Sequence, residues 1–383
     1  MNKHVVEELI AQGENSSIEF KSDNVRPEAL AREMVAFSNL LGGTVLIGVE
    51  DDGSITGLQP PHNEVWISTI ARNNIVPAIL PAVEIIKIEG KNIAVVQIPK
   101  GAHKPYQTLD GKFWIRVGST NRTATKEELS RLFQEAGLVH FDIAPVERTN
   151  MDALDPSKLH QYFETSYQID YMNLRPEEQH NILTNTDILV EIDEQYRASV
   201  GGILLFGKQP QRYLPQSSVM FAVFHGSELT DRLLDKKEIT GTLPEIIENT
   251  SALVQLFLPK PSVINGIKRD EKIQIPSKVI RETIVNAVCH RDYSMSNQKI
   301  SVYMFSNRIE ITSPGKIPNT ATLKKMIYGY SAPRNIFLVK YLDNMRYIDG
   351  LGRGIPMIKR TMQENVSFEE IGEVFRVILK YTV

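Results

Sequence analysis

The most constraining feature of the sequence is an apolar, helix-forming stretch, SKVIRETIVNAVCHRDY, that carries three polar residues at helical spacing. Glu282, Asn286 and His290 recur every fourth residue, so in a helix they lie along one stripe. Their neighbours, such as Ile284 and Val288, are apolar. Polar groups on an otherwise buried helix are unfavourable unless they have partners. Two interpretations stay open: a core helix with one solvent-facing edge, or a helix whose polar stripe meets a nucleotide and its magnesium.

A glycine-rich segment lies further along the chain. Gly350, Gly352 and Gly354 stand in DGLGRG, directly before a helix-forming stretch, IPMIKRTM. Glycine allows backbone amides to approach phosphate, and a helix N-terminus favours an anion. A plain turn is the usual explanation of a lone glycine cluster. Together with the polar helix and a predicted hairpin that runs through Ser313 to Gly315, the cluster favours a phosphate site.

The stretch GENSSIEFKSD near the N-terminus poses a similar choice. Glu19 and Lys21 alternate with apolar residues in a short predicted strand, and Glu14 precedes Glu19 by five positions. A solvated edge strand would explain these charges. A site that handles metal or phosphate would explain them as well.

The pattern of predicted elements indicates an α+β chain. Helices are expected at residues 2–12, from Pro27 to about residue 41, and in TKEELSRLFQEAG, LPEIIENTSALVQLFL and the polar stretch above. TVLIGVEDDGSITG predicts a hairpin, and GGILLFG and SVMFAVFHG predict short strands. The expected organisation is a first domain at 1–137, a linker at 138–153, a middle α/β region at 154–269 and a last domain at 270–383.

Composition limits the class of protein. The chain has 383 residues, of which 42% are hydrophobic and 23% charged, which is an ordinary globular balance. The single cysteine, Cys289, excludes an intrachain disulfide and favours a reducing cytoplasm. No apolar run approaches the length of a membrane span, and no signal-peptide core is present, so no membrane partner is expected. Because the net charge is −3, binding of nucleic acid requires a local basic patch.

One basic segment offers such a patch. Residues 100–126 contain six Lys or Arg and a single acid, with Tyr106, Phe113 and Trp114 interleaved. Cations bind phosphates and aromatic rings stack on unpaired bases, which favours RNA or single-stranded DNA as partner. The alternative is that the aromatic residues are core and the cations are merely solvated. The residues expected to contact nucleic acid are Lys21, Lys100, Lys104, Arg116 and Arg122.

The motifs RETIVNAVCHRDYS, NRIEITSPGKIP and IDGLGRGIPMI, in this order, resemble the C-terminal ATPase-like domain of Schlafen-related bacterial proteins often labelled RecG-like helicase or transcriptional regulator. That domain is similar to the GHKL ATP-binding fold, an α/β sandwich. The resemblance implies ATP as ligand, Glu282 as general base, Asn286 as magnesium ligand and glycines that line the triphosphate. His290, Ser313 and Gly315 would complete the nucleotide site, and Ser313 stands where GHKL proteins usually place the Asp that holds the adenine amino group. Since the sequence has no Gly-x-x-x-x-Gly-Lys-Ser/Thr loop, a helicase is not expected.

The N-terminal motifs GENSSIEFK, MVAFSNLLGGTVLIGVEDDGSITGL and FWIRVGSTNRTATKEEL resemble the Schlafen AlbA-like domain, over about residues 10–135. Some members of that family are Mg²⁺- or Mn²⁺-dependent ribonucleases. The resemblance implies catalytic and metal-ligating roles for Glu14, Glu19 and Asp51, with Glu50 and Asp52 as alternatives to Asp51. Three carboxylates repel one another unless a cation lies among them, and we therefore expect all three to converge on one divalent metal.

The leading hypothesis is a nucleic-acid-acting protein, a metal-dependent RNA nuclease regulated by ATP binding, in defence or stress response. The alternative is a non-enzymatic, nucleotide-gated, DNA-binding transcriptional regulator. The end of the chain, FRVILKYTV, leaves no room for the winged helix that many relatives carry, which disfavours the regulator. A third class is an ATP-dependent assembly component. We expect a cytoplasmic homo-oligomer.

Overall fold

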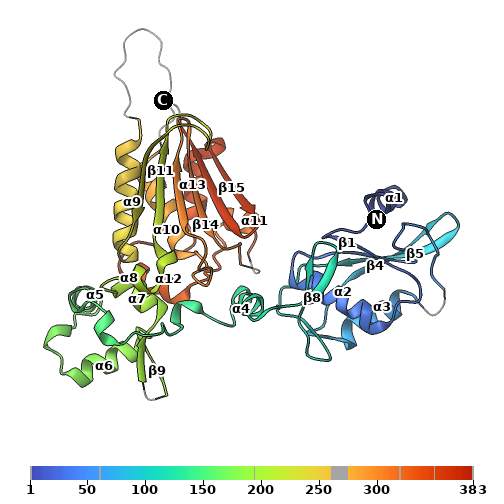
Figure 1. The fold of residues 1–383 in the computed structure, drawn as a ribbon, viewed down its shortest axis with the longest axis horizontal. Coiled ribbons are helices and arrows are strands. Elements are labelled where there is room, and N and C mark those ends of the chain that lie inside the picture. The colour runs from blue at the N-terminus through green and yellow to red at the C-terminus, as the bar shows by residue number, and fades with distance from the viewer. Residues whose placement is uncertain are drawn as a thin grey trace, which may run out of the picture. The chain divides into compact units, whose positions relative to one another are not determined.

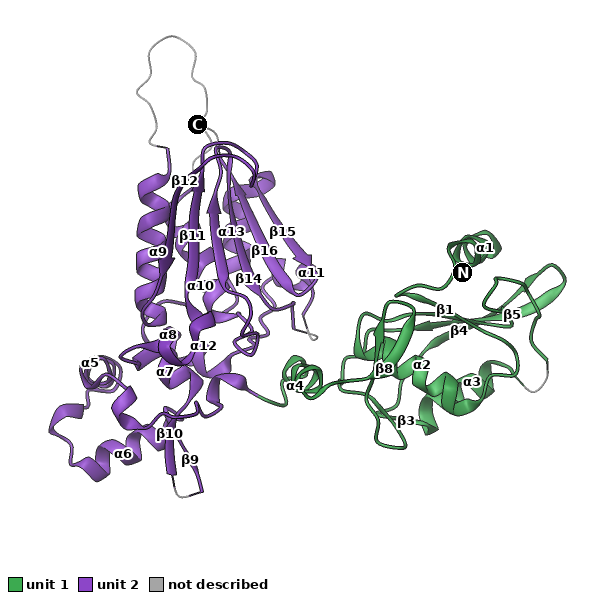
Figure 2. Cartoon of the chain, in the orientation of Figure 1, with its two compact units in different colours: residues 1–139 green, residues 140–383 purple. Residues whose placement is uncertain are grey.

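The computed structural model describes residues 2–59, 62–193, 195–259, 275–318, 321–348 and 350–381. The structure combines helices with several β-sheets, which confirms the predicted α+β class (Figure 1). The chain forms two compact units, Met1–Val139 and His140–Val383 (Figure 2). The boundary expected between residues 269 and 270 lies outside the described residues.

The first unit is built on a four-stranded sheet with the order β1-β2-β5-β4. β1 runs parallel to β2, with Glu19 opposite Val45, and the other pairs are antiparallel. The strands are β1 (Ile18–Lys21), β2 (Gly43–Ile47), β4 (Ala82–Ile88) and β5 (Lys91–Ile98). Two small antiparallel pairs are β3 (Ile75–Val76) with β6 (Gln107–Thr108) and β7 (Trp114–Val117) with β8 (Thr120–Thr123).

Helices cover both faces of this sheet. On one face, Val6 of α1 belongs to the same apolar cluster as Phe20 and Leu46. On the other face, Met34 of α2 belongs to a cluster with Val45. The alternation of side chains along a strand sends neighbouring residues into these two cores. The helices are α1 (Lys3–Gln12), α2 (Pro27–Asn39), α3 (Glu64–Asn73) and α4 (Lys126–Glu135), and α4 begins with a capping box formed by Thr125 and Glu128.

The second unit is built on a six-stranded sheet with the order β12-β11-β13-β14-β16-β15. β11 and β13 are parallel, and the other pairs are antiparallel. Two of the strands come from the predicted middle region and four from the predicted last domain. The strands are β11 (Val219–Phe224), β12 (Leu233–Ile239), β13 (Ile300–Met304), β14 (Arg308–Pro314), β15 (Val366–Ile371) and β16 (Val374–Lys380).

Three helices, α9 (Leu243–Phe257), α10 (Ser277–Cys289) and α13 (Gly354–Met362), lie together over one face of this sheet (Figure 1). One apolar cluster joins them to the strands and to the helices before β11. None of the helices in the described part of the chain has the length and apolar character that crossing a bilayer requires. The remaining elements of the unit are α5 (Pro156–Tyr167), α6 (Pro176–Asn185), α7 (Val200–Phe206), α8 (Pro210–Tyr213), α11 (Leu323–Ile327), α12 (Ile336–Asn344), the hairpin β9 (Leu189–Ile192) with β10 (Gln195–Ala198), and the 3-10 helices η1 (Phe141–Ile143), η2 (Met151–Ala153), η3 (Tyr171–Asn173), η4 (Pro215–Ser217) and η5 (Gln363–Asn365).

Two expected elements differ from the structure. GGILLFG is not a strand but helix α7, which Ser199 caps by accepting a hydrogen bond from the Gly202 amide at 2.9 Å. A short apolar run fits a buried helix as well as a strand, and here the whole helix is buried. The hairpin expected in TVLIGVEDDGSITG is reduced to a single bridge between Val49 and Ile55, because β2 pairs instead with β1 and β5.

The segment expected as a linker, residues 138–153, packs within the second unit from His140 onward. Asp142 is fully buried and accepts a hydrogen bond from the Leu338 amide in the first turn of α12 at 3.2 Å. Burial raises the pKa of this carboxyl, while the bonds to backbone amides oppose the shift.

Asn39, at the end of α2, joins three backbone groups of the first unit. Its Nδ2 donates to the Tyr106 and Trp114 carbonyls at 2.8 and 2.9 Å, and its Oδ1 accepts from the Tyr106 amide at 2.7 Å. The side chain is fully buried. It therefore holds the segment containing β6 and β7 against the helix.

We expect Asn39→Ala to lower the free energy of unfolding by about 3 kcal/mol, because it leaves buried amide and carbonyl groups without partners. Urea unfolding of the full chain measures this change. The control is Asn92→Ala, at an exposed position of β5, which should leave the midpoint nearly unchanged. Equal midpoints for the two variants would contradict the role given to Asn39.

Candidate functional site

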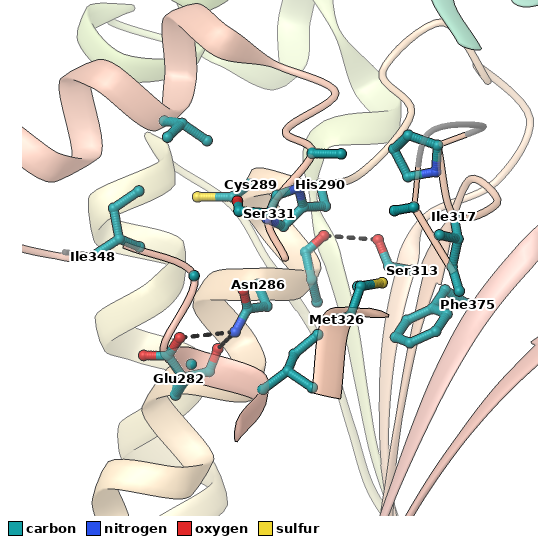
Figure 3. A pocket seen from close by; sticks show the side chains of 18 of the residues that line it. Glu282, Asn286, Cys289, His290, Ser313, Ile317, Met326, Ser331, Ile348 and Phe375 are labelled. Atoms are coloured by element: carbon teal, nitrogen blue, oxygen red, sulfur yellow. Dashed lines mark hydrogen bonds between the residues drawn. The ribbon is translucent and has the colours of Figure 1, made fainter. Parts of the chain in front are cut away.

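The nucleotide-site residues expected in the second unit line one cavity (Figure 3). They come from helix α10, from the end of β14 and the turn after it, and from the glycine segment that leads into α13. These are Glu282, Asn286, His290, Ser313, Gly315, Gly350, Gly352 and Gly354. The fold thus brings together three motifs that are far apart in the sequence.

Glu282 and Asn286 form a pair on α10 (Figure 3). The Nδ2 of Asn286 donates to Glu282 Oε1 at 2.9 Å and to the Glu282 carbonyl at 2.8 Å. Both bonds use the amide nitrogen, so the amide oxygen is the group with which Asn286 can coordinate a cation. An amide oxygen beside a carboxylate is a hard donor set that fits Mg²⁺.

The glycine segment approaches this pair closely. A Cβ on Gly354 would lie 1.8 Å from Glu282 Oε1 and 3.1 Å from Asn286 Nδ2. Gly352 has a φ of +69° and would place a Cβ 2.6 Å from the Gly329 carbonyl oxygen. At Gly352 the positive φ and the nearby backbone oxygen require glycine, whereas a side chain at Gly354 would displace the side-chain ends of Glu282 and Asn286.

The strand side of the cavity is mostly apolar. Ile311, Phe375 and Val377 line it together with Ser313. Ser313 is 7% exposed, and its hydroxyl donates to the Ala287 carbonyl of α10 at 2.7 Å. The cavity therefore has an apolar wall on the sheet and polar groups on the helix and glycine segment.

Two titratable groups at the end of α10 are uncharged at neutral pH. Burial, together with the positive charge of Arg334, lowers the pKa of His290 to about 4. Burial also raises the pKa of the Cys289 thiol far above its ordinary value. His290 is therefore a neutral imidazole, and Cys289 is a thiol rather than a nucleophilic thiolate.

Several residues of this site were missed by the sequence reasoning. Arg334 Nη1 pairs with Asp292 Oδ2 at 3.2 Å, and its Nη2 donates to the Lys316 carbonyl at 2.7 Å. Asn335 Nδ2 donates to the Cys289 carbonyl at 2.8 Å. These bonds tie the segment before α12 to the end of α10 and to the turn after β14. No sequence pattern marked Arg334 or Asn335. Two cations that do line the cavity, Lys316 and Arg353, adjoin the glycine motifs and could have been found there.

In the first unit, Glu14, Glu19 and Asp51 do not form the expected metal site. Glu14 Oε1 accepts the Phe20 amide at 2.9 Å, and Asp51 is exposed in a turn. The described residues contain no group of three or more His, Cys, Asp or Glu side chains placed to hold a metal. The convergence of three carboxylates on one cation was therefore a wrong prediction.

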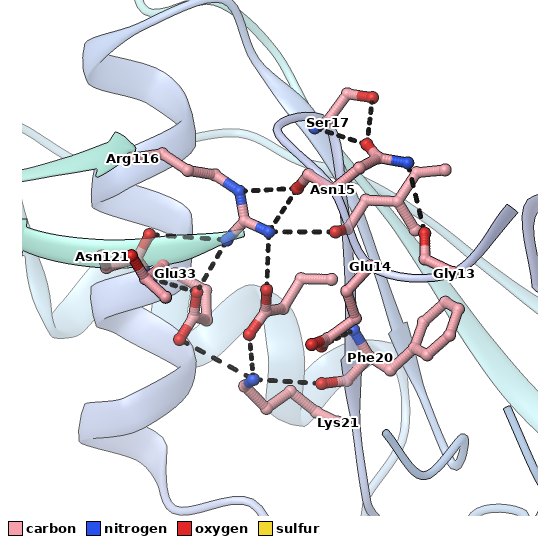
Figure 4. Close-up of polar contacts among 12 residues, drawn as sticks. Gly13, Glu14, Asn15, Ser17, Phe20, Lys21, Glu33, Arg116 and Asn121 are labelled. Atoms are coloured by element: carbon pink, nitrogen blue, oxygen red, sulfur yellow. Dashed lines mark hydrogen bonds and ion pairs between the residues drawn. The ribbon is translucent and has the colours of Figure 1, made fainter. Parts of the chain in front are cut away.

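The physical reason is that two cations of the protein, Lys21 and Arg116, which lie beside Glu33 in Figure 4, already neutralise Glu19. Arg116 Nη2 lies 2.7 Å from Glu19 Oε2, and Lys21 pairs with Glu19 Oε1. Glu33 of α2 completes the cluster, 3.7 Å from Arg116 and 3.9 Å from Lys21. Lys21 was expected to contact phosphate, and it pairs with these two carboxylates instead. We call Glu19, Lys21, Glu33 and Arg116 the ionic cluster.

Glu33 was missed by the sequence reasoning, although a signal existed. It lies three residues after Leu30 and four before Phe37, within the apolar stripe of α2. Its side chain is 3% exposed. Burial, and then the nearby charge of Glu19, raise the pKa of Glu33, while Lys21 and a hydrogen bond from Asn121 oppose the shift.

The basic segment also differs from expectation. The Lys104 and Arg116 side chains are only 2% and 1% exposed. Lys104 donates to the Leu40 carbonyl at 2.9 Å and pairs with Glu135 at 3.3 Å. Since both cations are buried in internal contacts, the prediction that they contact phosphate was wrong.

The other members of the basic segment divide between core and surface. Tyr106 is buried in the core. Arg122 forms two hydrogen bonds with Glu128, at 2.7 and 2.8 Å. The Lys100 side chain is half-buried. Part of the excess positive charge of this segment is therefore paired with carboxylates within the protein.

Two family models match the chain. Residues 14–125 match the Schlafen AlbA_2 domain. Residues 297–379 match a domain described as "Putative ATP-dependent DNA helicase recG C-terminal". These matches confirm the predicted layout, an N-terminal Schlafen AlbA-like domain followed by an ATPase-like domain similar to the C-terminal region of RecG-related proteins.

Two solved structures are similar to the chain. The DIP2311 protein from Corynebacterium diphtheriae is 20% identical, with 98% of this chain and 79% of that chain covered and a TM-score of 0.47. The N-terminal domain of a RecG-related protein from Nitrosomonas europaea is 26% identical, with 33% of this chain and 95% of that chain covered and a TM-score of 0.25. No curated protein matches the chain.

We expect Arg116→Ala to lower the free energy of unfolding by about 3–5 kcal/mol, because it leaves Glu19 and Glu33 buried with one cation fewer. Chemical unfolding of the full chain measures the change. Arg122→Ala, which removes an exposed ion pair of the same unit, is the control and should have little effect. A stable Arg116→Ala variant that loses affinity for nucleic acid would restore the phosphate-contact role.

Proposed function

We propose that the chain binds ATP with Mg²⁺ in the cavity of the second unit and binds nucleic acid through the first unit, with nucleotide controlling that binding. One observation supports the nucleotide site above all others. Eight residues from three separate motifs, spread over positions 282–354, line a single cavity. The family match of residues 297–379 to an ATPase-like domain supports the same ligand.

The cavity offers groups for the magnesium, the attacking water and the phosphates. Magnesium would neutralise phosphate charge, and Asn286 would hold it through its amide oxygen. Glu282, bonded to Asn286, is the group that could accept a proton from an attacking water. The amides of the segment around Gly352 and the N-terminus of α13 favour an anion. Lys316, which pairs with Glu373 at 2.5 Å, and Arg353 also line the cavity.

For the first unit, the ionic cluster supports one of the two earlier hypotheses over the other. A metal-dependent nuclease needs carboxylates that are free to bind a cation, whereas Glu19 is paired with Lys21 and Arg116. Its arrangement supports the alternative, a nucleotide-gated protein that binds nucleic acid without cleaving it. Cleavage remains the second candidate, because Glu19 and Glu33 are two buried carboxylates in one cluster that a metal could join if the cations withdrew.

ATP with Mg²⁺ should raise the melting temperature of the full chain by several degrees, because a ligand that binds the folded state stabilises it by mass action. Asn286→Ala should remove most of the magnesium-dependent part of this shift. Glu282→Gln keeps the shape of the side chain and should retain binding while losing any hydrolysis. Differential scanning fluorimetry and a phosphate-release assay measure the two effects.

The matched control is Asn181→Ala, an exposed asparagine of α6 that lies outside the cavity. It should give the wild-type shift. The absence of a shift at millimolar ATP in the wild-type protein would overturn the nucleotide site.

Single-stranded RNA and DNA should bind the full chain with an affinity that falls as salt rises, and ATP should change that affinity. Under the binding-only proposal, both nucleic acids stay intact in Mn²⁺ with or without ATP. Fluorescence anisotropy measures the binding, and denaturing gels measure integrity. Cleavage by the wild-type protein that Glu19→Gln abolishes would establish the nuclease instead.

Homo-oligomerisation, a cytoplasmic location and a role in defence stay predictions from the sequence. Helicase activity is not proposed, although the matched family description contains that word. The sequence lacks the phosphate-binding loop on which such motors depend.

A further inference from the structure

A second cavity lies in the second unit and is distinct from the nucleotide cavity. Its volume is about 300 Å³, at the lower end of the range of roughly 300–1,000 Å³ that small-molecule sites occupy. It is lined by α5, α7, the start of α9 and the residues after α12, at the end of the unit where α5, α7 and α12 gather (Figure 1). Among the described residues, the two cavities have no lining residue in common. The second cavity is therefore a separate candidate site.

The floor of the second cavity is apolar and rich in rings. Tyr162 of α5 and Phe206 of α7 are buried, and their ring centroids lie 5.3 Å apart. Leu205 and Met345 extend this surface, and Tyr347 adds a third ring. Such a floor suits a flat, apolar ligand surface, because bases and other rings stack on aromatic side chains.

Both tyrosines of the floor are held by contacts with residues outside the lining. Tyr162 Oη accepts a hydrogen bond from Asn344 Nδ2 at 2.9 Å, and Tyr347 Oη donates to Glu248 Oε1 at 2.6 Å. The guanidinium carbon of Arg281 lies 5.0 Å from the centroid of the Tyr347 ring. The hydroxyl groups of the two tyrosines are thus engaged within the protein, and toward the cavity these residues offer ring surface.

One stripe of α5 supplies polar groups to the second cavity. Gln161, Thr165 and Ser166 line it, and residues four and five apart in a helix lie on nearly the same side. Within the part of the chain that the structure describes, none of these three side chains makes a hydrogen bond. An amide and two hydroxyl groups can therefore donate to, and accept from, a ligand.

The charged groups at the second cavity neutralise each other. Lys158 Nζ lies 2.8 Å from Glu245 Oε1. Glu245 Oε2 also accepts hydrogen bonds from the Thr242 amide and hydroxyl at 2.7 and 2.9 Å, which caps the start of α9. Lys158 and Glu245 are the charged members of the described lining. Their charges sum to zero, so the lining holds no unpaired cation for a phosphate or a carboxylate.

We propose that the second cavity binds an uncharged nucleoside. The base stacks on the rings of the floor, and the ribose hydroxyl groups bond with the polar stripe of α5. A phosphate group would lose hydration without gaining an unpaired cation, so the nucleoside binds more tightly than its nucleotide. This preference is opposite to the one expected of the nucleotide cavity, where phosphate and magnesium contribute to binding.

Isothermal titration of the full chain with adenosine, guanosine, cytidine and uridine tests this site. At least one of them should bind with a dissociation constant on the order of 100 μM. Its 5′-monophosphate should bind about fivefold or more weakly. Thr165→Trp, which brings a larger side chain into the cavity from an exposed position of α5, should abolish nucleoside binding. The matched control is Glu164→Trp, at the neighbouring exposed position outside the lining, which should bind as the wild type does.

Gln161→Ala adds no bulk, removes one amide from an exposed position and should weaken binding about threefold to tenfold, so the test does not depend on the folding of Thr165→Trp. Failure of all four nucleosides to bind overturns the site. Nucleoside binding that is unchanged in both variants overturns its location, and tighter binding of the monophosphate overturns the class of ligand. None of these outcomes bears on the proposed ATP site, which the melting shift with ATP tests separately.

Discussion

The second unit depends on satisfying the buried end of helix α10. Three successive carbonyl groups of its last turn accept hydrogen bonds from outside the helix. Ala287 accepts from Ser313, Val288 from the Tyr293 hydroxyl, and Cys289 from Asn335. Since a buried helix end without partners is strongly unfavourable, β14, the turn after α10 and the segment before α12 must all converge there. The same convergence creates the cavity, so the demand of the fold and the candidate site coincide.

The first unit meets a similar demand with charge. Glu19 and Glu33 are buried, and Arg116 and Lys21 neutralise them within the protein. Such a cluster is stable only as a whole, because removal of one partner leaves an uncompensated buried charge. Internal neutralisation also changes the functional reading. Carboxylates paired with arginine are not free to hold a metal, and this pairing is the basis of the proposal that the first unit binds nucleic acid without cleaving it.

Much of the fold could be predicted because its signals are local. α1 ends at Gly13, α5 starts at Asp155 and Pro156, and α4 starts with its capping box, as the sequence indicates. The predictions failed where a local pattern fits more than one kind of element, or where the burial of a side chain determines its partners. GGILLFG was predicted as a strand and forms helix α7, because the sequence pattern of a short apolar run fits a buried helix as well as a strand. Lys104 and Arg116 were assigned to the surface because the sequence around a charged residue does not show whether its side chain is buried.

The sequence by itself determined the type and order of the main elements and the three motifs that line the cavity, because periodicity, caps and glycine positions act over a few residues. Only the tertiary structure decided which charges neutralise one another and which hydrogen atoms are already committed. Glu19 and Arg116 are nearly a hundred residues apart, and Ser313 meets Ala287 from another element. Contacts of this kind depend on how helices and strands pack, and that packing determines whether a carboxylate is free for a metal or a hydroxyl is free to donate.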